Sequence, residues 1–267
     1  MTRVTLGAAL LALLSACTTT TTTTEVQTQS PRENRSSGDA VADPARRAQL
    51  RLELASLYFE RGQSATALDE LKAALAARPD LPGAHNLQGL IHASMGEPRL
   101  AEASFQRALE VNPRDGEAMN NFGWTLCQQR RFDEADAMFA RALAQPQYRD
   151  PVRTLLAQGV CLARAGRWGD AERALARSYE IDPGNPTTGY NLSEVLLRRG
   201  ELERARFYVA RINAVPELSS AQTLWLAARI ERRLGNLGAL QDFGRQLVER
   251  FPQSTEALQF ERGRFDD

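Results

Sequence analysis

A 34-residue period runs through this chain and limits the folds that it can adopt. Residues of one type recur at this spacing in four pairs: Gly89 and Gly123, Ala101 and Ala135, Phe105 and Phe139, and Ala108 and Ala142. A fixed period of this size is typical of stacked structural units, each of which buries its apolar face against the next. The chain is therefore expected to form an elongated array of similar units.

The period and its residue types resemble the tetratricopeptide repeat (TPR), whose unit is a pair of antiparallel helices. Gly or Ala at the eighth and twentieth positions lets the two helices approach closely, and proline at position thirty-two ends the second helix. The sequence predicts an all-α, right-handed superhelical solenoid of about six repeats in a domain at 44–267. The repeats are expected at 48–81, 82–115, 116–149, 152–185, 186–219 and 221–254, with a short capping helix within 255–267.

Three departures interrupt the pattern. The third repeat has its closing proline displaced, and Asp150 and Pro151 are inserted before the fourth repeat. In the sixth repeat, Leu240 stands where two helices normally touch through a small residue. Ser254 is expected to cap a short last helix that runs through Phe260 and covers the open face of the sixth repeat.

The first seventeen residues have the pattern of an export signal. Arg3 supplies a positive charge, and residues 4–14 form an apolar core of about ten residues, too short to span a bilayer. The ending Leu14-Ser15-Ala16-Cys17 resembles the bacterial lipoprotein signal, in which residues 1–16 are removed and Cys17 becomes the lipidated N-terminus. An ordinary secretory peptide with an incidental cysteine is the alternative.

Residues 17–43 are expected to form a disordered tether. An unbroken threonine tract at 18–24 opens it, and the rest is too polar to compensate for the entropy lost on ordering. Thr18, not Asp, follows Cys17; in the enterobacterial sorting rule that this resembles, Asp there retains a lipoprotein at the inner membrane. We therefore expect a lipid anchor at the periplasmic face of the outer membrane.

Composition and motifs argue against an enzyme. Acidic and basic residues balance at 33 each, so no net charge attracts nucleic acid. His85 and His92 are the only histidines, and both fall at packing positions of the second repeat. The chain has no His-Glu-x-x-His, Gly-x-Ser-x-Gly or phosphate-binding glycine motif. We expect no catalysis, cofactor, metal or small-molecule substrate, and a protein as the partner.

TPR arrays line a concave groove with their first helices, chiefly through positions two, five, nine, twelve and thirteen. These positions predict a partner-binding groove of eight residues: Phe59, Asn86, Leu90, Asn120, Trp124, Val160, Tyr190 and Trp225. Leu52, Leu156 and Leu197 accompany them, and Arg229, Arg232 and Arg233 follow at the C-terminal end. Apolar and aromatic side chains on such a face suit a protein segment. Packing between repeats is the alternative for several of them, above all Trp124 and Leu156.

One known recognition mode is absent from these positions. Chaperone-binding TPR proteins hold a C-terminal carboxylate with a clamp of Lys and Asn, but Leu52 and Ser56 occupy the first clamp positions here. Recognition of an acidic C-terminus by that clamp is therefore not expected.

Cys127 and Cys161 remain in the folded part once Cys17 is lipidated. They lie on the first helices of the third and fourth repeats, and neighbouring helices in a solenoid are about 8–10 Å apart. A disulfide and two buried thiols are both compatible with that placement. The even number of cysteines favours a disulfide that links the two repeats across Asp150 and Pro151.

Several segments resemble one family more closely than the general TPR pattern, namely the type IV pilus pilotin lipoproteins (PilF/PilW family). They are residues 120–129, 142–148 with a Pro-x-Tyr insertion, 158–163 with a Gly-x-Cys sequence, 223–230 and 246–252. The likeness runs from about residue 48 to 254. Arg130, where the third repeat often has Gly, and the threonine tract depart from it.

The resemblance implies a role in pilus biogenesis. Members of this family are outer-membrane lipoproteins that the secretin, the exit channel of the pilus, needs in order to multimerise or reach the outer membrane. The resemblance also implies that Cys127 and Cys161 are bridged. A TPR scaffold for another envelope process, such as cell-wall synthesis or outer-membrane protein insertion, is the alternative.

Overall fold

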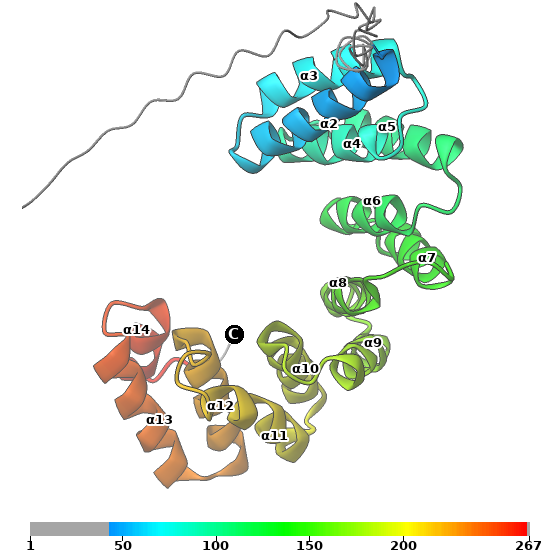
Figure 1. The fold of residues 1–267 in the computed structure, drawn as a ribbon. Helices are drawn as coiled ribbons and strands as arrows, with labels where there is room; N and C mark the ends of the chain where they lie inside the picture. The colour runs from blue at the N-terminus through cyan, green and yellow to red at the C-terminus, as the bar shows by residue number, and fades with distance from the viewer. Residues whose placement is uncertain (1–42, 266–267) are drawn as a thin grey trace, which may run out of the picture.

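The computed structural model describes residues 43–265, which contain thirteen α-helices and no strand (Figure 1). The first helices of six pairs are α2 (Pro44–Glu60), α4 (Ala84–Ser94), α6 (Gly116–Gln128), α8 (Pro151–Arg164), α10 (Pro186–Arg199) and α12 (Ala221–Leu234). The second helices are α3 (Ser64–Ala77), α5 (Pro98–Val111), α7 (Phe132–Leu143), α9 (Trp168–Ile181), α11 (Leu202–Asn213) and α13 (Leu237–Arg250). A last helix, α14 (Thr255–Glu261), follows. The expected all-α array of six helix pairs with a capping helix is confirmed.

The pairs stack in chain order and the array curves. Each second helix contacts its own partner and the helix that follows it, which is the first helix of the next pair or, for α13, the capping helix α14. Helix α6 also contacts α4 and α8. Figure 1 shows α6, α8 and α10 on the inner side of the curve, with α7, α9 and α11 outside. The predicted signal at 1–16, the lipidated Cys17 and the tether up to residue 42 lie outside the described residues and stay predictions. Between residues 43 and 265, no helix has the length and apolar character needed to cross a membrane.

Polar side chains fix where most first helices begin. The side-chain oxygens of five N-cap residues accept a hydrogen bond from the backbone of the first turn: Asp43, Asp115, Asp150, Asn185 and Ser220. Such a cap satisfies a backbone N–H that has no partner within the helix. Proline directly follows three of these caps, where its fixed φ favours the helix.

The turn within each pair depends on a left-handed residue. Five pairs place glycine there, with φ between 74° and 80°: Gly62, Gly96, Gly166, Gly200 and Gly235. The third pair instead has Arg130, whose φ is 63°. A residue with a Cβ in this region costs about 1–2 kcal/mol. The departure at Arg130 is therefore a strained turn within an otherwise regular repeat.

Close helix contact explains the small residues of the period. In the second pair the ring of Phe105 on α5 lies on Gly89 of α4, where an added Cβ would be 2.7 Å from the ring. Phe105 is fully buried, so its ring fills the space between the two helices.

In the sixth pair the glycine lies on the second helix instead of the first, and the aromatic ring comes from α14. Gly244 of α13 holds the repeat position of Phe105, and the ring of Phe260 from α14 lies directly against it. Leu240, which breaks the small-residue rule, is 7% exposed and shares a core cluster with Ala228 of α12. Ser254 caps α14, as expected, by accepting a hydrogen bond from the N–H of Ala257. Thus α14 supplies the aromatic side chain that the sixth repeat lacks.

Candidate protein-binding groove

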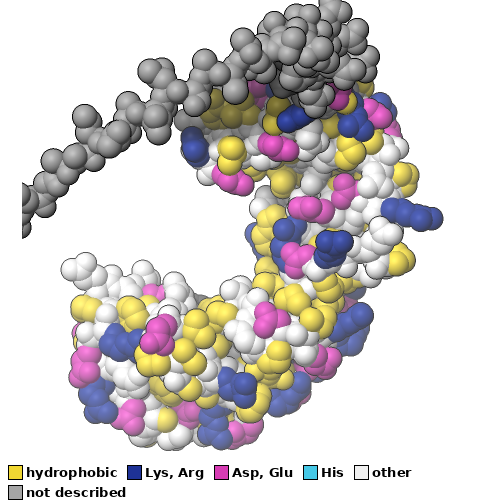
Figure 2. All heavy atoms as spheres, in the orientation of Figure 1, with side chains coloured by type: hydrophobic (Ala, Val, Ile, Leu, Met, Phe, Trp, Pro, Cys, Tyr) yellow, Lys and Arg dark blue, Asp and Glu magenta, His cyan; other side chains and the backbone are white. Residues whose placement is uncertain are grey.

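The inner face of the curve carries an apolar strip across three repeats. Leu90, Trp124 and Val160 occupy position nine of α4, α6 and α8, and all three are half-buried. Figure 2 shows hydrophobic side chains along the inner edge of the curve. Because neighbouring helices lie about 8–10 Å apart, the strip is about 20 Å long. An extended segment of about six residues has this length.

The other predicted groove residues divide by burial. Phe59 on α2 and Tyr190 on α10 are half-buried, like the strip. Asn86, Asn120 and Trp225 are 8%, 4% and 6% exposed, so they present little surface to a partner. Sequence position gives the face of a helix correctly but does not report what lies over that face.

A buried network of hydrogen bonds explains why Asn86 and Asn120 are buried. Asn121, which the sequence analysis did not single out, donates from Nδ2 to Oδ1 of Asn86 at 3.1 Å. Its own Oδ1 accepts from Nδ2 of Asn120 at 3.3 Å and from the Arg153 guanidinium at 3.1 Å. Thr154 on α8 donates to Oδ1 of Asn120 at 2.8 Å. The network joins the first helices of repeats two, three and four beneath the groove.

Tyr148, from the Pro-x-Tyr insertion, completes this network. Its ring packs on Gly116, where an added Cβ would lie 2.6 Å from the ring, and its hydroxyl is 2.6 Å from Oγ1 of Thr154. Because Thr154 donates to Asn120, the Tyr148 hydroxyl is the donor to Thr154. Burial raises the pKa of Tyr148 above its ordinary value. The insertion thus places an aromatic side chain between repeats three and four.

We expect Tyr148→Phe to lower the free energy of unfolding by about 1 kcal/mol, since it removes one hydrogen bond and keeps the ring. Urea denaturation at pH 7 would measure it, and Thr154→Val gives the second arm of a double-mutant cycle. The raised pKa means that the stabilising neutral form is lost as the pH rises above about 10. The Tyr148→Phe variant should lose less stability in that range; equal alkaline losses would contradict the assignment.

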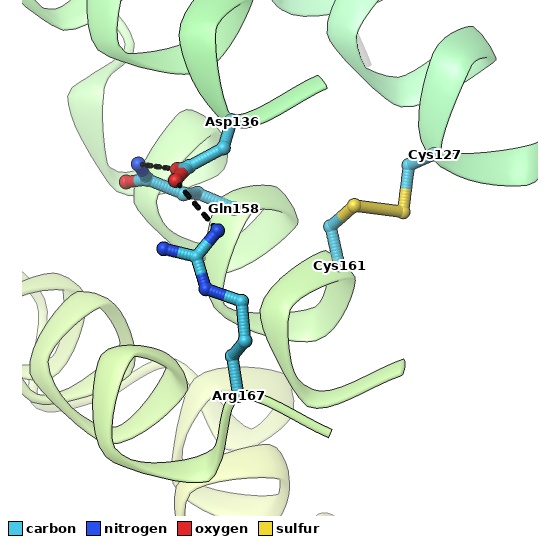
Figure 3. Close-up of a disulfide and its surroundings, with 5 residues drawn as sticks. All are labelled: Cys127, Asp136, Gln158, Cys161 and Arg167. Carbon is cyan, nitrogen blue, oxygen red and sulfur yellow. Dashed lines mark hydrogen bonds and ion pairs between the residues drawn. A yellow bond between two sulfur atoms is a disulfide. The ribbon is translucent and has the colours of Figure 1, made fainter. Parts of the chain in front are cut away.

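A disulfide joins the same two repeats. Cys127 near the end of α6 is bonded to Cys161 of α8, with their Cα atoms 5.8 Å apart (Figure 3). Both cysteines are buried, at 0% and 2% exposure. Trp124 precedes Cys127 by one helical turn, and Val160 directly precedes Cys161. The disulfide therefore fixes the spacing of two residues of the apolar strip.

Polar contacts link α8 to the outer helices. Gln158 Nε2 donates to Asp136 of α7 at 2.7 Å, and Arg167 pairs with the same carboxylate at 3.2 Å (Figure 3). They border an outer cleft of about 530 Å³ between α7, α8 and α9. Gln158 and Arg167 both bind Asp136, so these three side chains already have partners within the protein.

The equivalent contact between repeats two and three is a bidentate ion pair. Arg131 donates to both carboxylate oxygens of Glu102, at 2.6 and 3.2 Å, and also to Glu134. The guanidinium of Arg131 lowers the pKa of Glu134. Arg131 and Arg167 occupy the same repeat position, so the junction of repeats two and three and that of repeats three and four contain the same kind of ion pair. Partly exposed pairs of this kind contribute about 0–1 kcal/mol each.

The C-terminal end of the groove is polar and mostly paired. Position nine holds Glu194 on α10 and Arg229 on α12, which form an ion pair at 3.3 Å. Arg233 donates to the carbonyl of Leu197 at 2.7 Å. Tyr190 lies beside this pair, and burial is the main cause of its raised pKa. The groove therefore changes from apolar to charged along its length.

The described residues contain no group of three or more His, Cys, Asp or Glu that could hold a metal ion. His85 contacts the carbonyl of Pro79 at 3.0 Å, and His92 contacts Glu97 at 2.6 Å. His85 thus has a structural partner at the end of the preceding repeat, and His92 has one within its own repeat.

The sequence and the architecture of this chain are similar to those of known proteins. Models of the tetratricopeptide repeat match residues 52–97, 86–148, 120–186 and 162–224. The chain is 26% identical over 229 residues to the type IV pilus assembly protein PilF of Pseudomonas aeruginosa, covering 86% of this chain and 90% of that protein. It is similar to the crystal structure of PilW, a widely conserved type IV pilus biogenesis factor, with a TM-score of 0.73 and 30% identity. That match covers 79% of this chain and 97% of the other. The solved structure of P. aeruginosa PilF matches with a TM-score of 0.70 and 22% identity, covering 82% and 99%.

Proposed function

The chain belongs to the tetratricopeptide-repeat family and is homologous to the type IV pilus biogenesis proteins PilF and PilW, and we propose that it is their pilotin counterpart. As such it is an outer-membrane lipoprotein that binds secretin subunits and promotes their multimerisation or their placement in the outer membrane. The observation that carries this proposal is similarity to PilF over 86% of the chain, well beyond one or two shared repeats.

The groove supplies a physical basis for binding a secretin segment. The strip of Leu90, Trp124 and Val160 is apolar and half-exposed, which suits a short apolar segment of an unassembled subunit. The Cys127–Cys161 disulfide and the Tyr148 network hold the helices that present the strip. A preorganised surface loses less entropy on binding than a mobile one.

The N-terminal sequence supplies the location in this proposal. Lipidation at Cys17 anchors the protein at the periplasmic face of the outer membrane, and residues 18–43 connect the anchor to the array. Removing the lipid by Cys17→Ser should move the protein out of the outer-membrane fraction.

Deleting the gene and blotting for heat-stable secretin multimers tests the proposed activity. We expect the multimers to be lost without the protein and restored by the wild-type gene. Val160→Arg places a charge in the apolar strip and should reduce the multimers several-fold, because desolvating that charge opposes binding.

Phe207→Arg is the matched control for that variant. Phe207 is a 54%-exposed apolar residue on the outer helix α11, so the same charge there should leave multimers at the wild-type level. Normal multimers in the deletion strain would refute the pilotin proposal and favour a scaffold for another envelope process. Equal effects of the two variants would instead refute binding through the groove.

A further inference from the structure

The groove residue Trp225 is covered by Phe265, in a short segment at 262–265 that follows α14 and is called the tail below. The ring of Phe265 stacks on Trp225, with centroids 5.0 Å apart and planes 25° apart. The guanidinium of Arg232 lies over the same Phe265 ring, 4.4 Å from its centroid. Phe260 adds an edge-on contact at 5.8 Å. Phe265 thus contacts three side chains. Two of them, Trp225 and Arg232, lie two turns apart on the same side of α12.

This contact lies at the end of the predicted groove. Trp225 holds position five of its repeat, the position that Tyr190 holds in the preceding one. Helix α14 borders the same region: burial raises the pKa of Tyr190, and the negative charges of Glu194 and Glu256 add to the effect. The tail therefore covers the part of the inner face where the array ends.

The cation beside the Phe265 ring favours a ligand that carries a carboxylate. Arg229 and Arg233 already have partners in Glu194 and a backbone carbonyl. Arg232 has no ion pair with any residue between 43 and 265, and its contact there is the Phe265 ring. In the sequence, two aspartates follow Phe265 directly. An aromatic side chain next to carboxylates matches both the ring-binding surface and the available cation.

The tail is attached in a way that permits release. Gly263, with φ 63°, follows the C-cap residue of α14, and residues 262–264 are all exposed. Only Phe265 of this last segment is partly buried. One stacked aromatic pair contributes about 0.5–1.5 kcal/mol beyond its area, and a cation–π contact about 0.5–1 kcal/mol. A competing segment with the same chemistry can displace a contact of this strength.

We propose that Trp225, Arg232 and Phe260 form a binding site for an aromatic side chain flanked by carboxylates, and that Phe265 occupies this site until a partner segment displaces it. This deepens the proposed function, on which it rests, by naming the chemistry of a segment that the C-terminal end of the groove accepts. It also makes the tail a built-in competitor. A tethered ligand on a short linker acts at an effective concentration of about 1 mM.

The test is a binding titration with a peptide that copies residues 263–267, labelled at its N-terminus and followed by fluorescence anisotropy. The protein is the full chain, either wild type or Phe265→Ala. We expect the Phe265→Ala protein to bind the peptide with a dissociation constant of about 1 mM or lower. Because the tail competes at an effective concentration of about 1 mM, wild type should bind the peptide at least about twofold more weakly. A peptide with Ala in place of the Phe should lose that binding. Adding Arg232→Ala should weaken it several-fold.

Several outcomes would overturn the proposal: equal affinity of wild type and Phe265→Ala, equal binding of the Ala peptide, or no saturable binding up to several millimolar. A chain that ends at residue 263 provides a second protein with an open site, and circular dichroism with thermal unfolding verifies the fold of each. No secretin is present in this titration. Its failure therefore leaves the pilotin proposal intact, and failure of the multimer experiment leaves the peptide site intact.

Discussion

Replacing Cys161 with alanine should lower the free energy of unfolding by about 4 kcal/mol under oxidising conditions. The disulfide closes a loop with a sequence separation of 34 residues, and the loss of loop entropy in the unfolded chain gives this magnitude. Alanine is the appropriate replacement because both cysteines are buried, so a serine hydroxyl would need a new partner. Urea unfolding of oxidised wild type and variant would measure the difference.

Two controls separate the covalent bond from the packing of sulfur. Cys127→Ala should lose about as much stability as Cys161→Ala, and the double variant little more, since one bond is removed in every case. Wild type with a reducing agent should approach the variants and keep its thiol packing. If reduced and oxidised wild type unfold at the same urea concentration, the disulfide does not stabilise the array.

The disulfide also connects stability with the groove. Cys127 and Cys161 adjoin Trp124 and Val160, so losing the bond frees the two helices that carry most of the apolar strip. The Tyr148 contact and the ion pair of Arg167 with Asp136 act at the same junction. The third and fourth repeats are therefore joined both covalently and by polar contacts, within the proposed binding surface.

The helical framework was predictable because the period itself encodes it. Small residues such as Gly89 permit close helix contact, and caps such as Asp115 and Asp150 mark where helices begin. These signals are local or lie one repeat apart, so a single sequence displays them. The insertion near Tyr148 was also visible in the sequence, but the residues that Tyr148 contacts were not. Nothing in the sequence around a tyrosine between two helices indicates which hydroxyl group or glycine its side chain will contact.

The candidate site was less predictable because it depends on contacts between distant segments. Asn120 was placed on the groove, yet its neighbour Asn121 draws it into a buried network with Asn86 and Thr154. Trp225 occupies a groove position, yet Phe265 covers it from forty residues further along the chain. The paired asparagines at 120 and 121 were a usable signal, since adjacent amides on a helix facing other helices need partners. Nothing local pointed to Phe265.

The sixth repeat gives the second large expected effect on stability. Two substitutions that each lower the free energy of unfolding should compensate each other. Phe260→Ala should lower the free energy of unfolding by about 3 kcal/mol, because it leaves a void over Gly244. Gly244→Leu alone should cost about 2–3 kcal/mol, because its side chain would collide with the Phe260 ring. Together the changes should cost less than either alone, since leucine fills the space that the ring leaves. Leu71 and Leu175, both fully buried, hold this repeat position in α3 and α9.

Urea unfolding of the two single variants and the double variant would measure this coupling, and amide hydrogen exchange in α12 and α13 would locate it. Additive losses of about 5 kcal/mol would contradict the assignment and mean that Phe260 stabilises the array through another contact. Among the described residues, the one aromatic ring that Phe260 contacts is that of Phe265, with the ring centroids 5.8 Å apart. Repeating the cycle in the Phe265→Ala background distinguishes the two: the compensation persists there if Phe260 acts through Gly244, whereas the cost of Phe260→Ala disappears if it acts through Phe265.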